Sequence, residues 1–157
     1  MAKTEVINIE GKTEFGVNVT DVVGMTGKNR REDIMLLQAL FNYIAAGLHP
    51  QVLGLGGSYN IPDINGEMDA DTFLAIGEFQ IRNASRLLMH NFDGHIHPAS
   101  YKNRVIRNIK GRLMSITLLH LLAKDAGVMQ GHSDYREGLI KLKPELATYL
   151  DRFIVDL

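Results

Sequence analysis

Two similar segments, each leading from a tight turn into a helix, constrain the fold of this chain more than any other feature. The first is Asp63–Thr72 and the second is Phe92–Ser100. Each carries Asn or Asp, then Gly, one further residue, an apolar residue and, later, a hydroxyl residue. The glycine can adopt a positive φ, and the polar side chain can cap the following helix. We therefore expect two turn-to-helix units packed around a shared apolar core.

A first helix is predicted before these units by four apolar residues at three- and four-residue steps. Asn29 and Glu32 form a capping-box pattern at its start, and Gly47 is a natural stop. The residues of the apolar stripe are Ile34, Leu37, Phe41 and Ile44. Residues 48–62, rich in glycine and with two prolines, are predicted to be a long surface loop.

Further helices follow from the same kind of pattern. The second helix is predicted to start at Asp69 as its N-cap and to end near Asn83, followed by a loop over residues 84–98. A third is predicted over about 99–126, ended by Gly127.

The two ends of the chain carry smaller signals. Alternating residues predict a β-hairpin over 4–19. The segment Asp134–Glu137 is typical of the polar start of a helix, and a last helix is predicted from Pro144 to Leu157. The expected fold is therefore mainly α with a small N-terminal β-hairpin.

Four short signatures occur in order: Leu37-Gln38, Asn65-Gly66, Ala75–Gln80 and Asp93–Ser100. In this order they resemble the peptidoglycan-binding-domain-like family, whose pattern is L-Q, D-G-x-φ-G-x-x-T, F-Q and D-G-x-φ-G-P-x-T. The resemblance covers about residues 30–110. It implies a three-helix bundle that holds the stem peptide or glycan of peptidoglycan in a shallow groove.

The resemblance also suggests how the chain is divided. Residues 1–28 would be an N-terminal hairpin extension, and residues 29–112 the peptidoglycan-binding-like helical domain. Residues 113–157 would form a C-terminal helical extension packed on the same core.

The groove implied by the resemblance lies at the turns and the adjacent helix ends. Its expected ligand-binding residues are Asn65, Gly66, Thr72, Gln80, Asp93, Gly94 and His95. Each also has a structural interpretation, because Asn-Gly and Asp-Gly favour turns whether or not a ligand binds. Thr72 can cap a helix, and the amides of Gln38 and Gln80 can bind neighbouring loop backbone.

Three histidines form the only cluster with the composition of a metal site. His95 and His97 could share a zinc ion on an extended segment, and His90 lies nearby. No H-E-x-x-H-like pattern supplies a third ligand. We therefore predict neither a bound metal nor a cofactor, with His95 and His97 as the weak candidates.

Cleavage of glycans would need two carboxylates a few ångströms apart, one of them held protonated. No pair stands out, so a small cell-wall hydrolase remains an alternative and not the main prediction. The candidate carboxylates are Glu67, Asp69, Asp71, Glu78, Asp134 and Glu137.

Charge and cysteine content exclude several other classes of function. The absence of cysteine excludes disulfides, a thiolate nucleophile and a Cys-ligated metal. The net charge of −1 indicates neither a nucleic-acid nor a membrane partner, although residues 82–113 carry seven basic residues against one acid. On the predicted third helix only Tyr101 lies close to the basic residues for stacking bases, so nucleic acid is not expected. The carboxylates of muramyl peptides would suit this positive stretch as well.

The N-terminus lacks the apolar core of a secretory signal, and no stretch approaches the roughly 20 apolar residues of a membrane span. We expect synthesis in the cytoplasm and, for work at the cell wall, delivery by another route. The predicted function is non-catalytic binding of peptidoglycan as a targeting module. The main alternative is a structural adaptor with a protein partner in a phage-tail or secretion assembly.

Overall fold

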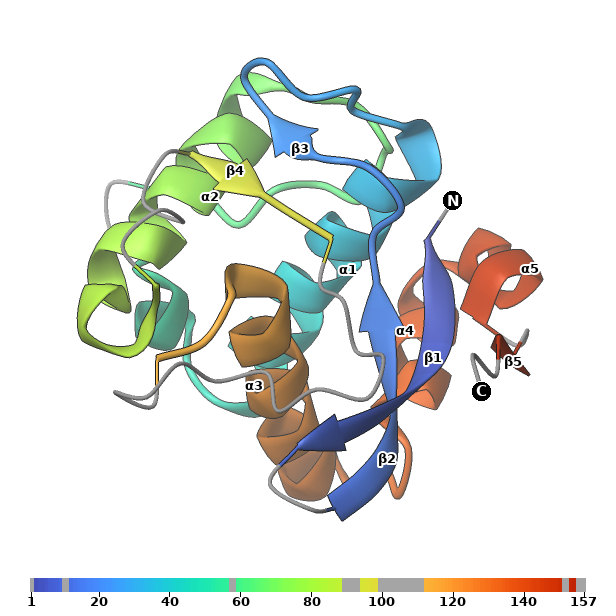
Figure 1. Cartoon of the computed structure of the whole chain (residues 1–157). Helices are drawn as coiled ribbons and strands as arrows, with labels where there is room; N and C mark the ends of the chain where they lie inside the picture. Colours follow the sequence, from blue (N-terminus) through green and yellow to red (C-terminus); the bar gives the residue numbers. More distant parts are fainter. Residues whose placement is uncertain are drawn as a thin grey trace.

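The chain is mainly helical, with a small antiparallel hairpin at its N-terminal end (Figure 1). The computed structural model describes residues 2–9, 12–56, 59–88, 94–98, 112–150 and 153–154. The α-helices are α1 (Arg31–Gly47), α2 (Ala70–Arg82), α3 (Ser115–Gln130), α4 (Tyr135–Leu142) and α5 (Ala147–Leu150). The 3-10 helices are η1 (Pro50–Leu53), η2 (Ala84–Arg86) and η4 (Pro144–Leu146). The strands are β1 (Lys3–Ile9), β2 (Lys12–Asn18), β3 (Val23–Gly24), β4 (His95–Ile96) and β5 (Phe153–Ile154).

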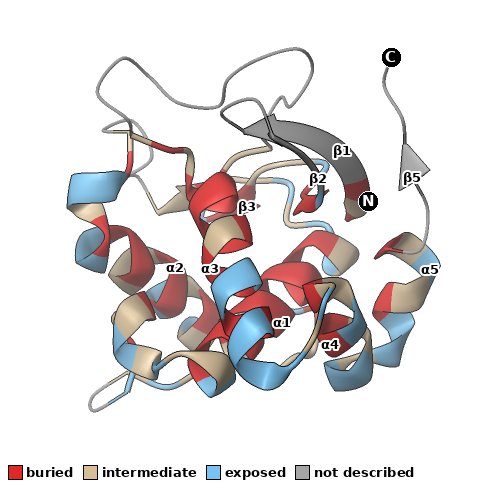
Figure 2. Ribbon diagram, turned by 90° about the horizontal axis from the view of Figure 1, so that it is seen from below, coloured by how far each residue is buried: buried red, intermediate tan, exposed pale blue. Residues whose placement is uncertain are grey.

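Helix α1 is the centre of the core. Every residue from Asp33 to Ala45 except Asn42 is buried, so the predicted apolar stripe is only part of its buried surface. A helix that is buried on all sides belongs inside a domain rather than on its surface. Figure 2 shows buried residues on the sides of the helices that face one another and exposed residues on their outer sides.

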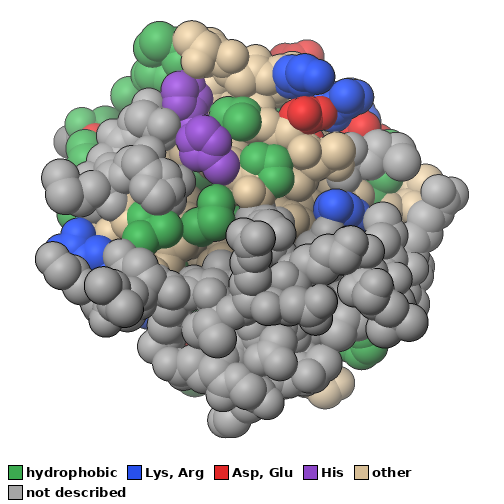
Figure 3. All heavy atoms as spheres, in the orientation of Figure 1, with side chains coloured by type: hydrophobic (Ala, Val, Ile, Leu, Met, Phe, Trp, Pro, Cys, Tyr) green, Lys and Arg blue, Asp and Glu red, His purple; other side chains and the backbone are tan. Residues whose placement is uncertain are grey.

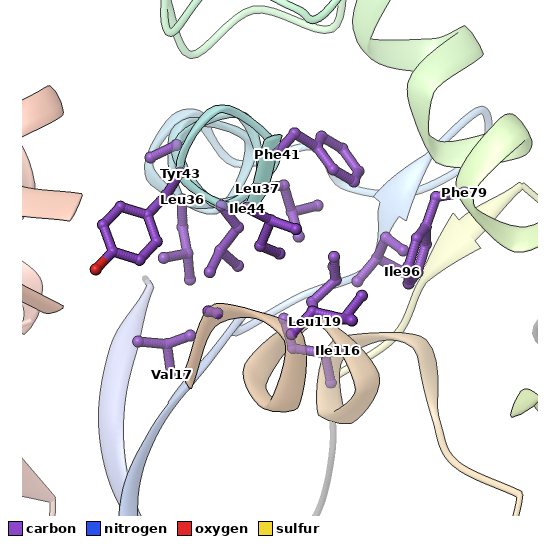
Figure 4. Packing of buried hydrophobic residues seen from close by; sticks show 14 of the residues in the cluster. Val17, Leu36, Leu37, Phe41, Tyr43, Ile44, Phe79, Ile96, Ile116 and Leu119 are labelled. Carbon is purple, nitrogen blue, oxygen red and sulfur yellow. The ribbon is translucent and has the colours of Figure 1, made fainter. Parts of the chain in front are cut away.

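Side chains from several elements close around α1. Figure 4 shows Phe79 of α2, Ile96 of β4 and Ile116 of α3 meeting the apolar side chains of α1, and all three are fully buried. The rings of Phe41 and Phe79 lie 6.1 Å apart in a tilted arrangement. Burial of each such side chain contributes about 1.5–3 kcal/mol to folding. The bundle of α1, α2 and α3 is therefore held by one continuous core.

The start of α1 corrects the predicted capping box. The N-cap is Arg30, and Asn29 lies outside the helix with a φ of 51°. The Asn29 side chain instead accepts from the Gly24 amide and donates to the Gly24 carbonyl, both at 2.8 Å. The Asn29 side chain is therefore engaged by the backbone of Gly24 in β3 and does not cap α1. The predicted placement of Glu32 and Asp33 in the first turn is confirmed. Their negative charges there interact favourably with the positive end of the helix dipole.

The predicted hairpin is confirmed, with Lys3 opposite Asn18 and Ile9 opposite Lys12. The predicted last helix is wrong in its second half. Pro144 begins a 3-10 turn and α5 ends at Leu150, after which β5 pairs in parallel with β1. Phe153 and Ile154 have helical spacing in the sequence, but their backbone pairs with the free edge of strand β1 instead of extending the helix.

The predicted helix over 99–126 is also corrected. Residues 112–114 are not helical, because Leu113 forms a bridge with Leu87 through its amide and carbonyl. Helix α3 begins at Ser115 and passes through Gly127 to end at Gly131, whose φ is 76°. The predicted start, over residues 99–111, lies outside the described residues.

The second helix is confirmed, since α2 spans Ala70–Arg82 with Asp69 as its N-cap. The predicted surface loop over 48–62 is only partly correct, because it contains η1 and buries Leu53 and Leu55. The predicted loop over 84–98 contains η2 and the short strand β4. None of the described helices is long and apolar enough to cross a membrane.

Candidate functional site

Gln38 of α1 holds the turn before α2. Its Oε1 accepts from the Asn65 amide at 2.9 Å and from the Gly66 amide at 2.8 Å. Its Nε2 lies within 2.9–3.0 Å of Asn65 Oδ1, the Glu67 carbonyl and Thr72 Oγ1. We call Gln38, Asn65, Gly66 and Thr72 the first glutamine corner. Because Gln38 and Thr72 are fully buried, these polar atoms satisfy one another inside the protein.

Asp69 joins the first glutamine corner to helix α2. Its Oδ1 accepts from the amide and hydroxyl of Thr72 at 2.9 and 2.6 Å, and its Oδ2 accepts from Asn65 at 3.1 Å. Burial raises the pKa of Asp69, but these hydrogen bonds lower the pKa more, so it lies below its ordinary value. Asp69 is therefore held ionised as a helix cap, not in the protonated state that a glycosidase acid requires.

The first glutamine corner is covered from outside by Arg31. Gly66 is buried with a φ of 74°, and a Cβ there would lie 2.6 Å from Cγ of Arg31. The Arg31 guanidinium in turn binds Glu145 of η4 at 2.8 and 3.3 Å. The C-terminal segment thus reaches over the N-terminus of α1 and fixes the residue that closes this corner.

Gln80 of α2 repeats the arrangement before α3. Its Oε1 accepts from the Gly94 amide at 2.9 Å, and its Nε2 donates to the His95 carbonyl at 2.8 Å and to Ser115 Oγ at 3.3 Å. We call Gln80, Gly94, His95 and Ser115 the second glutamine corner. The two corners confirm that Gln38 and Gln80 bind loop backbone, and in both a glutamine also contacts a hydroxyl of the helix that follows.

The hydroxyl group that contacts Gln80 in the second unit is not the predicted one. The spacing of the first unit predicts Ser100, whereas the hydroxyl that contacts Gln80 belongs to Ser115 at the start of α3. Ser100 itself lies outside the described residues, as does Asp93.

The second glutamine corner keeps part of its surface exposed. Gly94 has a φ of 78°, and no atom of the described residues, apart from its chain neighbours, lies within 4 Å of where its Cβ would be. The adjacent turn after β3 contacts this corner from one side, where Thr26 Oγ1 lies 3.0 Å from Nε2 of His95. The rings of His95 and His97 meet edge to face with centroids 5.9 Å apart. Figure 3 shows histidine side chains at the surface next to hydrophobic ones.

The structure sorts the predicted site residues into two groups. Asn65, Gly66 and Thr72 lie at the start of α2, whereas Gln80, Gly94 and His95 lie at its end. Thr72 and Gln80 are eight positions apart on α2, which corresponds to about 12 Å along the helix axis. Within the described ranges, no three His, Asp or Glu side chains are grouped closely enough to hold a metal ion.

The sequence interpretation missed a pocket between β2 and the turn that joins α3 to α4. Its floor includes His132 and Tyr135, which are each hydrogen-bonded to a buried ring. The available sequence signals were Gly127 and Gly138, two glycines inside helices that packing should explain. Because Gly127 also matches the glycine that often ends a helix, the sequence alone does not identify it as a packing position.

Comparison with protein-family models, with curated proteins and with solved structures finds no match to this chain. The resemblance to peptidoglycan-binding modules therefore remains a prediction. The geometry of the two glutamine corners is the observation on which a proposal about function can rest.

Proposed function

We propose that this protein binds bacterial peptidoglycan without cleaving it and that the second glutamine corner forms its contact surface. The supporting observation is the pair of glutamine corners, in which the residues that carry the family resemblance have matching hydrogen-bonding roles. At each corner a glutamine holds a glycine turn and a helix hydroxyl together.

The exposed surface of the second glutamine corner supplies the contacts. His95 and His97 are partly exposed, and Met25 beside Thr26 is 69% exposed and apolar. Gly94 has no side chain, and no described residue beyond its chain neighbours covers the position of a Cβ there, so a ligand can approach this part of the backbone closely. A shallow surface of this kind binds weakly by itself and would act through repeated contacts along the wall.

Co-sedimentation with purified sacculi tests this proposal. The wild-type protein should sediment with the sacculi, and Met25→Asp should reduce the bound fraction at least fivefold. Met129→Asp is the matched control, because Met129 is 71% exposed on α3 and lies outside the corner. Failure of the wild-type protein to sediment, or equal losses in both variants, would contradict the proposal. Release of soluble wall fragments would contradict its non-catalytic part.

A second candidate function is that of a structural adaptor with a protein partner in a tail-like or secretion assembly. It is favoured by the outer face of α2, where Leu74 and Ile81 lie two turns apart and are 43% and 70% exposed. Gly77 between them faces open space, which leaves the helix backbone accessible. Co-purification of assembly components with the tagged protein, lost in Ile81→Asp and retained in Val128→Asp, would support this candidate over wall binding.

A further inference from the structure

The outer face of α2 carries a stripe of uncharged residues that the core does not use. Ala70, Leu74 and Ile81 are exposed, and Gly77 lies between the two larger side chains. Apart from its chain neighbours and its own helix, no described residue lies within 4 Å of where a Cβ of Gly77 would be. Figures 1 and 2 show α2 at an outer edge of the molecule. We call these four residues the outer stripe of α2.

The spacing of the outer stripe is that of the apolar seam between two paired helices. Steps of four, three and four residues place positions 70, 74, 77 and 81 along one narrow line of α2. The core packs on the opposite side of the helix, where Ala75, Ile76 and Phe79 are buried. Helix α2 therefore has a second apolar side, whereas a surface helix ordinarily has a polar one there.

The outer stripe is complementary in shape to its own reversed copy. In an antiparallel pair of α2 helices centred between Leu74 and Gly77, Leu74 of each copy lies opposite Gly77 of the other. Ile81 then lies opposite Ala70 at both ends. Each large side chain meets a small residue, which lets the two helices interdigitate closely. A parallel pair would set Leu74 against Leu74 and leave a gap between the two glycines.

The charges beside the outer stripe favour the same antiparallel direction. Asp71 lies near the start of α2 and Arg82 at its end, on the same margin of the stripe. Nε of Arg82 donates to the Gln51 carbonyl at 3.1 Å, and within the described part of the chain no carboxylate pairs with Arg82. Antiparallel pairing brings Asp71 of each copy towards Arg82 of the other, whereas parallel pairing sets like charges side by side. Glu78 on this margin offsets part of the attraction, so the charges set the direction and the outer stripe supplies the binding.

We propose that a second copy of this chain covers the outer stripe, which gives a weak symmetric dimer with the two α2 helices antiparallel. A two-fold interface uses the same patch on both copies, so the patch must fit its own reversed copy, as this stripe does. The contact of a single helix pair is small, so the copies associate at high protein concentration or where they are held close together. The proposal does not rest on wall binding, and it assigns the face to a different partner from that of the adaptor candidate.

Sedimentation equilibrium over a concentration series up to about 1 mM tests the dimer. The apparent mass of the wild-type protein should rise from one chain towards two. Ile81→Asp places a charge in the stripe and Gly77→Gln fills the space for Leu74, so each should weaken association by about tenfold or more. Glutamine is a better helix former than glycine, so the urea midpoint of Gly77→Gln should not fall. Loss of association in that variant is thereby separated from misfolding.

Val128→Asp is the matched control, because Val128 is an exposed apolar residue on α3, outside the outer stripe. It should associate like the wild type. A single-chain mass for the wild type throughout, equal losses in Val128→Asp and Ile81→Asp, or full association of Gly77→Gln would overturn the proposal. So would a different protein that co-purifies through Ile81 while the wild type alone stays a single chain. Sacculi are absent from this measurement, so the dimer and wall binding can fail independently.

Disulfide exchange tests the direction of the two helices, because the chain has no cysteine of its own. Ala70→Cys and Ile81→Cys copies, mixed in a glutathione redox buffer, should form the mixed disulfide in preference to either homodimer by about fivefold or more. Positions 70 and 81 lie opposite each other only in the antiparallel pair. A predominance of the two homodimers would show a parallel pair and contradict the proposed arrangement.

Discussion

The two glutamine corners follow one plan but differ in what lies over them. The first holds five partner atoms around Gln38 and is closed by Arg31. The second holds three around Gln80, and no described residue beyond the chain neighbours of Gly94 covers the position of a Cβ there. The same local unit therefore serves as an internal clamp at one end of α2 and as an exposed surface at the other. At the first corner the covering residue, Arg31, is in turn paired with Glu145 of η4.

The largest expected effect compares the two glutamines themselves. Gln38→Ala leaves several buried polar groups unpaired and should lower the free energy of unfolding by about 3–5 kcal/mol. Gln80→Ala leaves fewer and should lower it by about 1–3 kcal/mol. Urea denaturation followed by circular dichroism measures both. Equal effects, or a larger effect at Gln80, would refute the proposed difference between the corners.

Substitution of the turn glycines, Gly66 and Gly94, should also lower the free energy of unfolding by different amounts. Gly94→Ala introduces only the strain of a positive φ, about 1–2 kcal/mol. Gly66→Ala adds a clash with Arg31 and should be more destabilising by about 1–2 kcal/mol. In an Arg31→Ala background the gap between the two substitutions should narrow, because the side-chain clash has been removed and only the Arg31 carbonyl oxygen remains close, 3.2 Å from the added Cβ. Thermal or urea unfolding of the four variants checks this, and an unchanged gap in that background would exclude Arg31 as the cause.

The third prediction concerns pH. The folded-state pKa of Asp69 is below its unfolded value, so its contribution to stability is fully present above the unfolded value of about 3.9. That contribution is lost as the pH falls through the folded pKa. Asp69→Asn should therefore lose less stability than the wild type between pH 6 and pH 3, which urea denaturation at both values measures. An identical loss in both proteins would show that Asp69 does not titrate in this way.

The smallest expected effect is at the ion pair over the first glutamine corner. Arg31 and Glu145 are each about half exposed, so their attraction is screened by solvent and salt. Glu145→Gln should reduce stability slightly in low salt and have no measurable effect in high salt. Thermal unfolding at the two salt concentrations measures the change. A large loss in Glu145→Gln that persists in high salt would mean that Glu145 contributes through packing.

Local chemistry made much of this arrangement predictable. The Asp69 cap, the hairpin, the positive φ of Gly94 and the roles of Gln38 and Gln80 all follow from residues close to one another in the sequence or from amides that need partners. Each of these features is satisfied within one turn or by one side chain. The sequence therefore carried enough information to place them.

Features that depend on distant partners were not predictable. Asn29 matched a helix cap but binds Gly24, and Phe153–Ile154 matched a helix but pair with β1. Ser115 could not be recognised as the partner of Gln80, because it lies 35 positions along the chain from Gln80, whereas Ser100 matches the spacing of the first unit. The pocket depends on Gly138 accommodating Tyr43 from a distant helix. In each case a tertiary contact decided between two locally reasonable structures.

Amide chemical shifts during titration with soluble peptidoglycan fragments test the central claim most directly. The account predicts shifts at Gly94, His95 and Thr26, with Asn65 and Gly66 unchanged because their amides are bound by Gln38 beneath Arg31. Shifts centred on Asn65 and Gly66, or no shift at either glutamine corner, would contradict it.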